Sequence, residues 1–419
     1  MQPPIILFDD DLGCFGPMAD LRAAFEIRSG ADSAVRRVAR WAAGRLAALW
    51  VPRRLRDIVT ERATLPVNEL PSSIATDRPV VLLSGRLLLP DDALSPEAGQ
   101  AIVDAHGDLV AASMEAVQAA RLLDALAASS TPLLELLRQV FPAVRVVDRP
   151  DLHLARRPWD ILGALARTIT FDGLADRPRL AREAAPATVM GDHPVIIEAS
   201  ARLWPGVVID AEHGAVIIRA KAVVRPHATL SGPCVVGEGA TVLDQAMVRA
   251  NTVIGPMCKV AGEISGTIFQ GFANKAHDGF LGDSYVGKWA NLGAGTTNSN
   301  LLNTYGEVSM RLAPGAPRER SGRQFLGAII GDHAKMAIGT RLMTGTAIGT
   351  GAMVACTAPP PTCTPAFAWL TDEDPGGARR WRLDRFEETM RAVMARRDRE
   401  PSAAYLRRVR DLHEAASAA

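Results

Sequence analysis

The chain has few aromatic residues, few cysteines and almost no net charge. Lysine and arginine number 47 against 46 aspartates and glutamates in 419 residues, so the formal net charge is +1 and no basic excess predicts binding to nucleic acid. Scattered cysteines favour buried thiols in a reducing compartment over a disulfide framework or a metal site. There are five of them, Cys14, Cys234, Cys258, Cys356 and Cys363.

Long hydrophobic runs are also missing. No apolar stretch approaches the length of a membrane span, and the opening segment MQPPIILFDDD has three aspartates and no basic region, unlike a signal peptide. We therefore expect a cytoplasmic protein with no membrane partner. The length allows two or three domains with a large core.

The strongest pattern is a period of six residues between 215 and 262. Its blocks read AVIIRA, KAVVRP, HATLSG, PCVVGE, GATVLD, QAMVRA, NTVIGP and MCKVAG. The fourth place is always a branched aliphatic and the second is small or β-branched, which neither the helical period of 3.6 nor the strand period of 2 produces. The pattern predicts a hexapeptide-repeat solenoid, a left-handed parallel β-helix in which three blocks make one turn and the aliphatic residues fill the inside.

The repeat also predicts where the coil begins, breaks and ends. Aliphatic residues fall in register from Val189, and the segment from Thr296 to Phe325 interrupts the hexads, so we expect it to leave the coil as a loop. The hexads resume at Ile330, and the three prolines from Pro359 to Pro361 are expected to end the coil. From Arg379 to about His413 the apolar spacing predicts one amphipathic helix with an arginine-rich outer face.

Upstream of the coil, short apolar runs alternate with helical stretches, which predicts an α/β layered domain. The expected strands are 4–8, 80–83 and 144–147, the expected helices are 111–128, 133–140 and 156–165, and 175–186 is expected to be an exposed connector. We place the domain boundaries at residues 1–185, 186–365 and 366–419.

The most irregular part of the coil, residues 272–300, is where chemistry is expected. His277 lies where the hexad pattern lapses, with Lys275, Asp278 and Asp283 nearby. Because imidazole titrates near neutrality, His277 is a candidate general base for an attacking amine or hydroxyl. The alternative is a surface histidine hydrogen-bonded in a turn.

The segment from Lys275 to Asn300 resembles the acetyltransferase half of the bacterial bifunctional N-acetylglucosamine-1-phosphate uridyltransferase/glucosamine-1-phosphate acetyltransferase. The whole chain resembles an alternative form of that enzyme that is classed with the sugar nucleotidyltransferases. The matching motifs are Ile6 to Asp10, Arg22 with Arg28 and Gly30, Arg157 to Asp160, Asn274 to Gly282, Gly331 to His333, Phe367 to Trp369 and Met394 to Arg397. The resemblance implies a nucleotidyltransferase-like front domain and an acyltransferase coil that serve nucleotide-sugar biosynthesis.

The resemblance also implies roles for individual residues of the coil. His277 would be the general base and Glu263 would orient its ring. The groove for the sugar and acetyl-CoA would be lined by Asn274, Lys275, Asn291, Ala294 and Asn300. The acetyl group would then pass directly from acetyl-CoA to the amine of a hexosamine 1-phosphate, with no covalent intermediate. We expect Cys234 and Cys258 to point inward, and we expect the coil to assemble as a homotrimer.

The chain departs from the bifunctional enzyme at three places near the site. Ser265 stands where a phosphate-binding lysine is expected, and Phe280 and Leu301 stand where that enzyme has tyrosines. The phosphate of the acceptor must then be bound elsewhere, by Lys275, Lys288 or an arginine of the interrupting loop. The identity of the acceptor sugar is open.

The front domain is expected to bind UTP or another nucleoside triphosphate with Mg²⁺. Asp9 and Asp10 are candidate Mg²⁺ ligands, and Arg22, Arg28 and Gly30 are candidates for phosphate binding. The usual glycine-rich phosphate loop is missing, so a degenerate binding module is the alternative. Two further alternatives are a non-catalytic structural solenoid and a γ-type carbonic anhydrase, which the lack of a closely spaced histidine pair disfavours.

Overall fold

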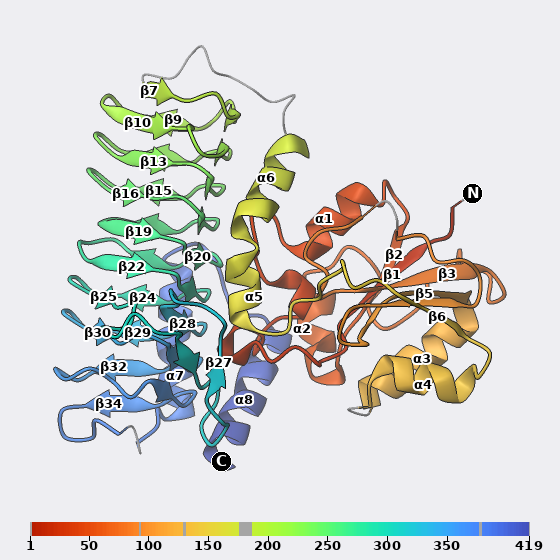
Figure 1. The fold of residues 1–419 in the computed structure, drawn as a ribbon. Coiled ribbons are helices and arrows are strands. Elements are labelled where there is room, and N and C mark those ends of the chain that lie inside the picture. The colour runs from red at the N-terminus through yellow and green to blue at the C-terminus, as the bar shows by residue number, and fades with distance from the viewer. Residues whose placement is uncertain (1, 92–93, 129–130, 176–186, 377–378, 419) are drawn as a thin grey trace. The chain divides into compact units, whose positions relative to one another are not determined.

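The computed structural model describes residues 2–91, 94–128, 131–175, 187–376 and 379–418 (Figure 1). The chain divides into two compact units. The first is Met1–Phe15, Leu21–Ile27 and Asp32–Arg157, and the second is Gly16–Asp20, Arg28–Ala31 and Pro158–Ala419. The predicted boundary between residues 185 and 186, and the connector before it, lie outside the described residues.

The first unit is built on one mixed sheet of six strands in the order β2-β1-β3-β5-β4-β6. Strand β1 is parallel to β2 and β3, β5 is antiparallel to β3 and β4, and β6 is parallel to β4. The strands are β1 Ile5–Phe8, β2 Leu46–Trp50, β3 Pro79–Ser84, β4 Gln100–Val103, β5 Leu109–Glu115 and β6 Arg145–Asp148. This arrangement confirms the predicted α/β class and the three predicted strands.

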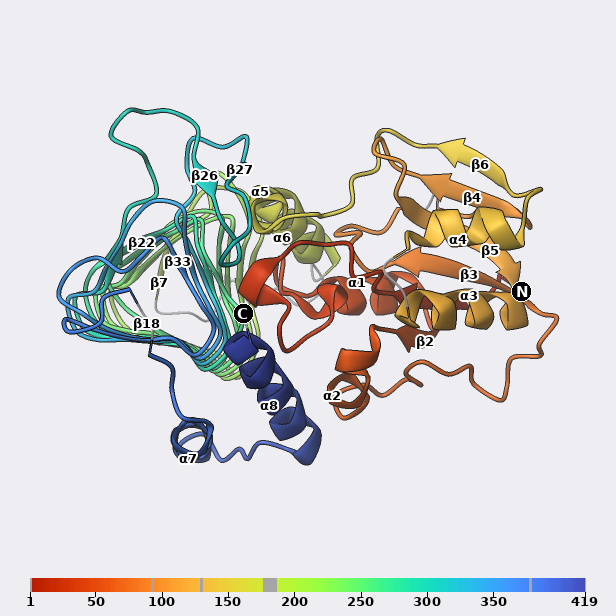
Figure 2. The same cartoon turned by 90° about the horizontal axis from the view of Figure 1, so that it is seen from below.

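Helices cover the sheet of the first unit. The α-helices are α1 Ala34–Trp41, α2 Arg56–Thr60, α3 Ala116–Ala128 and α4 Leu133–Val140, with short 3₁₀ turns Ala24–Glu26 and Arg53–Leu55. Helices α3 and α4 lie side by side and share one apolar core with the sheet (Figure 2). The prediction of a single helix over 111–128 was wrong at its start, because 109–115 is strand β5. That strand is buried on both faces, so its run of small and apolar residues has no period of two to reveal it.

The second unit is a parallel β-solenoid, which confirms the fold predicted from the hexads. Three parallel sheets form its sides, and Figure 2 looks along the coil. The first side holds β7 Ala187–Met190, β10 Val207–Asp210, β13 Thr229–Ser231, β16 Met247–Val248, β19 Glu263–Ser265 and β22 Phe280–Gly282. The second holds β8 Val195–Ile197, β11 Val216–Ile218, β14 Cys234–Val236, β17 Thr252–Ile254, β20 Ile268–Phe269, β23 Tyr285–Val286, β28 Ala328–Ile330, β31 Thr346–Ile348 and β33 Cys363–Thr364.

The third side carries the strands that matter most for the site. It holds β9 Arg202–Leu203, β12 Val223–Val224, β15 Thr241–Val242, β18 Lys259–Val260, β21 Asn274–Lys275, β24 Asn291–Leu292, β29 Lys335–Met336, β32 Met353–Ala355 and β34 Trp369–Thr371. The aliphatic fourth place of each hexad points into one continuous core, together with Cys234 and Cys258. Burial raises the pKa of both thiols to about 12, which makes them poor nucleophiles, as predicted.

The end of the coil and the helical segment after it differ from the prediction. The coil continues past the prolines at 359–361, because β33 and β34 add a further rung. The predicted single C-terminal helix is two helices, α7 Leu383–Ala395 and α8 Ala403–Ala418. Pro401 lies between them and lacks the N–H that a continuous helix would need there.

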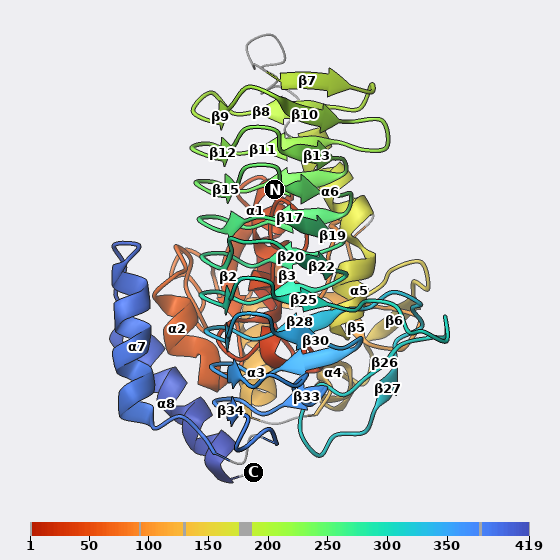
Figure 3. The same cartoon turned by 90° about the vertical axis from the view of Figure 1, so that its left-hand side faces the viewer.

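The interruption leaves the coil as predicted, although its first residues remain in a rung. Strand β25 Thr297–Asn298 pairs with β30 Arg341–Leu342, and the excursion then forms an antiparallel pair, β26 Ser309–Met310 with β27 Glu319–Arg320 (Figure 3). Helices α5 Pro158–Gly163 and α6 Leu165–Ala175 also belong to this unit. None of the described helices is long and apolar enough to cross a bilayer.

Candidate functional site

His277 lies at a corner of the coil, in the turn between β21 and β22. His277 and Asp278 are exposed in this turn, whereas the strands on either side of it are largely buried. In the part of the chain that the structure describes, the imidazole ring meets no hydrogen-bond partner. An exposed ring without a competing partner is suited to accept a proton from a bound substrate.

Lys275 lies directly beneath this turn, and its position differs from the sequence prediction. Its side chain is 1% exposed. The ammonium donates to the main-chain oxygens of His277 at 2.9 Å, Asp278 at 2.8 Å and Ala261 at 3.4 Å. Burial lowers the pKa of Lys275 to about 8. The group therefore faces the backbone of the His277 turn, and it does not reach outward to bind a phosphate as expected.

Glu263 lies on β19, in register with Phe280 of the neighbouring strand β22. Its carboxylate pairs with the guanidinium of Arg249, and both side chains are at least partly exposed. Within the described residues the predicted contact between Glu263 and the ring of His277 is not formed. The orienting role of Glu263 stays a prediction.

Two of the predicted groove residues stand together on the third side of the coil. Asn274 and Asn291 are cross-strand neighbours on β21 and β24. Asn291 is exposed, and the side-chain oxygen of Asn274 accepts a hydrogen bond at 2.9 Å from Arg397, just after α7. The Met394 to Arg397 motif therefore reaches the strand that precedes His277, a contact that the sequence prediction did not anticipate.

The other two groove residues lie further along the chain, in and after the next corner. Ala294 is half-buried, and its oxygen accepts the N–H of Gly339 at 2.7 Å. Asn300 donates to Asp283 at 2.7 Å. Burial raises the pKa of Asp283 above its usual value. Asp283 has φ of +44°, in the left-handed region that residues other than glycine seldom adopt.

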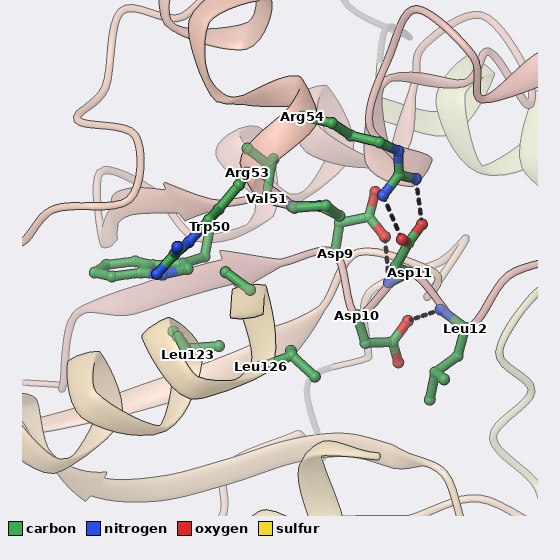
Figure 4. A pocket seen from close by; sticks show the side chains of 12 residues that line it. Asp9, Asp10, Asp11, Leu12, Trp50, Val51, Arg53, Arg54, Leu123 and Leu126 are labelled. Atoms are coloured by element: carbon green, nitrogen blue, oxygen red, sulfur yellow. Dashed lines mark hydrogen bonds and ion pairs between the residues drawn. The ribbon is translucent and has the colours of Figure 1, made fainter. Parts of the chain in front are cut away.

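The first unit contains a separate pocket of about 320 Å³ at the carboxyl ends of β1 and β2. Ligands of open α/β sheets bind at such strand ends. Its lining includes an aromatic ring, two arginines and three consecutive aspartates (Figure 4). The residues are Asp9, Asp10, Asp11, Leu12, Trp50, Val51, Pro52, Arg53, Arg54, Leu123, Leu126 and Ala127.

The three aspartates of this pocket have different partners. Asp9 accepts the N–H of Ala24 at 2.7 Å, and burial nevertheless raises its pKa to about 6. Both oxygens of Asp10 are held by the buried guanidinium of Arg86, at 2.8 and 2.6 Å. Asp11 pairs with Arg54 at the pocket rim. Of the three aspartates that line this pocket, Asp10 and Asp11 are each paired with an arginine and Asp9 is not.

These contacts do not fit the predicted Mg²⁺ site at Asp9 and Asp10. Arg86 already supplies the positive charge at Asp10, and a carboxyl with a raised pKa such as Asp9 favours a proton over a metal ion. The described residues contain no group of three or more histidine, cysteine, aspartate or glutamate side chains that could hold a metal.

The predicted phosphate-binding residues are also separated. Arg22 is buried in the first unit and is not part of the pocket lining. Arg28 and Gly30 belong to the second unit, where the N–H of Arg28 donates to Gln270 at 2.8 Å. Arg53 and Arg54, which follow β2, are the arginines that line the pocket, and no motif in the sequence had pointed to them.

Known proteins resemble parts of the chain. Residues 5–176 match the family model described as sugar nucleotidyl transferase. The bifunctional protein GlmU of Methanococcus vannielii is 32% identical over 111 residues, which is 26% of this chain and 26% of that protein. The bifunctional sugar-1-phosphate nucleotidylyltransferase/acetyltransferase of Sulfurisphaera tokodaii is 29% identical over 109 residues, which is 26% of this chain and 27% of that protein. These matches confirm the predicted resemblance.

The matches are partial in length. The chain spans only about a quarter of the length of these two curated relatives. Among solved structures, the acetyltransferase domain of PglB from Neisseria gonorrhoeae in complex with acetyl coenzyme A aligns with 84% of this chain and 96% of that chain, at 13% identity and a TM-score of 0.16.

Proposed function

We propose that the chain carries two transferase activities on sugar phosphates. The solenoid would transfer an acetyl group from acetyl-CoA to the amine of a hexosamine 1-phosphate. The first unit would transfer a nucleotidyl group from UTP or another nucleoside triphosphate to the sugar 1-phosphate. The observation that carries the acyl transfer is the exposed, unoccupied ring of His277 at a corner of the coil; the family match over residues 5–176 supports the nucleotidyl transfer.

The proposed acyl transfer uses His277 as general base. The ring accepts a proton from the amine while the nitrogen attacks the thioester carbonyl, so a C–N bond forms and the C–S bond then breaks. The departing thiolate of coenzyme A takes up a proton. Backbone N–H groups near the corner would stabilise the oxyanion that develops on the carbonyl oxygen.

We propose that the coil works as a cytoplasmic homotrimer. Large apolar side chains on its surface support this, since soluble monomers seldom expose large apolar patches to water. Ile338 is 80% exposed, and Met247 and Met343 are each more than 40% exposed. Packing three coils together would bury such side chains and would bring residues of a neighbouring copy toward His277.

For the first unit we propose that the nucleotide occupies the pocket of Figure 4. Arg53 and Arg54 support phosphate binding, and the Trp50 ring supports contact with a base or sugar. A second candidate is a unit that binds nucleotides without catalysis. The pairing of Asp10 with Arg86 favours it, because it removes the acid expected to hold the metal.

One assay separates these activities. The purified protein is incubated with glucosamine 1-phosphate, acetyl-CoA and UTP, and free thiol and pyrophosphate are followed separately. Release of thiol that depends on the sugar phosphate supports the acyl transfer, and release of pyrophosphate supports the nucleotidyl transfer. Release of thiol without pyrophosphate would support a first unit that binds nucleotides without catalysis. If neither thiol nor pyrophosphate is released, the proposal is contradicted.

A further inference from the structure

One residue breaks the apolar interior of the third side of the coil. The inward-facing residues of its nine strands stack into a column that we name the inner ladder. Register pairs its members in order as Leu203, Val224, Val242, Val260 and Lys275, followed by Leu292, Met336, Val354 and Leu370. Lys275 is the only charged residue in this ladder, whose strands all lie within the described ranges.

A lysine at this position costs stability that an aliphatic side chain would not. Its neighbours in the ladder, Val260 and Leu292, are 0% and 2% exposed. Removing an ammonium from water is unfavourable unless hydrogen bonds replace its hydration. Because the coil forms elsewhere with valine, leucine or methionine at this place, folding alone does not explain why a charge stands here.

The contacts of the ammonium show what the charge does. Two of its three acceptors are the carbonyls of His277 and Asp278, the exposed residues of the turn. Hydrogen bonds from a charged donor are stronger than those from a neutral one. The next residue, Gly279, has φ of +108°, and a Cβ there would lie 2.3 Å from the oxygen of Thr296. The turn is therefore held from inside by Lys275 and from the following rung by close backbone packing.

We propose that Lys275 is a positioning residue for acyl transfer, whose ammonium fixes the main chain at His277 so that the imidazole stands in one place at the corner of the coil. This inference rests on the proposed function of His277. It assigns to Lys275 a role through the backbone and not through contact with the phosphate of the substrate.

The test is Lys275→Met, which gives the ladder the side chain that Met336 already provides. We expect a folded protein whose Tm is not lower than that of the parent. If the turn loosens, kcat for acetyl transfer should fall roughly 10- to 100-fold, in line with the effect of misplacing a catalytic group by about 1 Å, while KM changes little. A loss of phosphate binding would instead raise KM.

Lys335→Met is the matched control. The pKa of Lys335 is also lowered by burial, to about 8. Lys335 lies in register with Asn291, two strands from β21, and its ammonium donates to the oxygen of Trp289 at 2.8 Å, which is outside the His277 turn. We expect this variant to keep the kcat of the parent. A similar loss in both variants would mean that any buried lysine of the coil matters, and would overturn the specific role of Lys275.

Hydrogen exchange gives a readout that does not depend on activity. Amides of residues 276–279 should exchange faster in Lys275→Met and unchanged in Lys335→Met, because local opening follows the loss of the contacts that hold a segment. Parent-like kcat, parent-like exchange in the turn, an unfolded Lys275→Met protein, or a change confined to KM would each overturn the proposal. If the parent itself transfers no acetyl group, or if His277→Ala stays active, the proposed function fails instead, and the exchange result still decides whether Lys275 holds the turn.

Discussion

The solenoid and the front α/β unit bury polar groups in opposite ways. In the coil, the aliphatic fourth residue of each hexad faces the core together with most of the small second residues, and the one charged residue of the inner ladder donates to the turn that follows it in sequence. In the front unit, charges are buried in pairs whose members are far apart in sequence, such as Asp10 with Arg86. The interior of the coil can be predicted from the sequence because its pattern repeats locally. The buried ion pairs of the front unit cannot, because their members are far apart in the chain.

The charge network of the front unit extends beyond that pair. Arg86 also contacts Asp108 at 3.0 Å, and Arg156 contacts both Asp104 and Asp108 at 2.7 Å. Two arginines thus share three aspartates across strand ends and loops. The bond from Arg156 to Asp104 helps to keep the pKa of that carboxyl below its usual value, against the opposing effect of burial. Such a network orders the loops around the strand ends only while all its members are present.

The largest effect is expected at the corner of the coil. His277→Ala should lower acetyl transfer by on the order of 10²–10⁴, because it removes the proton acceptor. Stability and any nucleotidyl transfer should not change, since the ring is exposed and belongs to the second unit. Thiol and pyrophosphate release, with thermal unfolding as control, measure this; a variant that loses both activities would mean that the two regions are not independent.

Arg86→Met should show the contrasting behaviour of the front unit. It leaves Asp10 buried without its partner, and breaking a buried pair on one side costs about 3–5 kcal/mol. Hydrogen exchange should rise across β1 and β3 while the coil stays protected. The matched control is Arg145→Ala, whose pair with Glu97 is exposed, so the free energy of unfolding should change by less than about 0.5 kcal/mol. If both variants lowered the free energy of unfolding equally, burial of the Asp10–Arg86 pair would not explain its contribution to stability.

The inner ladder allows a sharper comparison through pH. The pKa of Lys275 is about 8 in the folded coil and 10.5 when exposed. Between pH 8 and 10.5 the lysine is therefore protonated in the unfolded chain and largely neutral in the folded one, so the free energy of unfolding of the parent rises with pH in this range. Below pH 8 the full cost of burying the charge is present, about 3 kcal/mol for such a shift. Lys275→Met should therefore be more stable than the parent at pH 7, and the difference should shrink toward pH 10.5. Denaturant titrations at both pH values measure it.

A constant difference between parent and Lys275→Met across this range would mean that the lysine stays charged throughout. Lys335 titrates in the same window but is common to both proteins, so its contribution cancels. Asp278, whose charge raises the pKa of Lys275, is likewise unchanged.

Most of the coil could be predicted from the sequence, but few of the contacts between charged side chains could. Eighteen residues separate Val242 from Val260 in register, whereas fifteen separate Val260 from Lys275, so the rung before His277 is three residues short. That shortening is why the hexad phase was lost beside the site and why the inward place of Lys275 went unrecognised. His277 could be selected because an irregular segment stands out in a regular repeat. The hydrogen bond from Arg397 to Asn274, on the strand before His277, joins residues 123 apart in sequence and could not be predicted.

In the front unit the strand Ile5–Phe8 was predictable from its apolar run, and the aspartates after it were visible as candidates. Their partners were not, because Arg86 approaches Asp10 through the pairing of β1 with β3. Arg28 followed the same motif as Arg22, yet it belongs to the solenoid unit through Gln270. A motif gives the spacing of residues along the chain and not the unit to which each one folds.

The smallest effect is expected for Glu263, which forms a partly exposed ion pair on the coil. Its pair with Arg249 is partly exposed, and such pairs contribute about 0–1 kcal/mol, so Glu263→Gln should leave the Tm nearly unchanged. If the carboxylate orients His277 when substrate binds, kcat should fall by less than about tenfold, well below the loss expected for removing a general base. In a His277→Ala background the substitution should add no further loss, because an orienting group has nothing left to orient. Additive losses in the double variant would show instead that Glu263 acts on the substrate by itself.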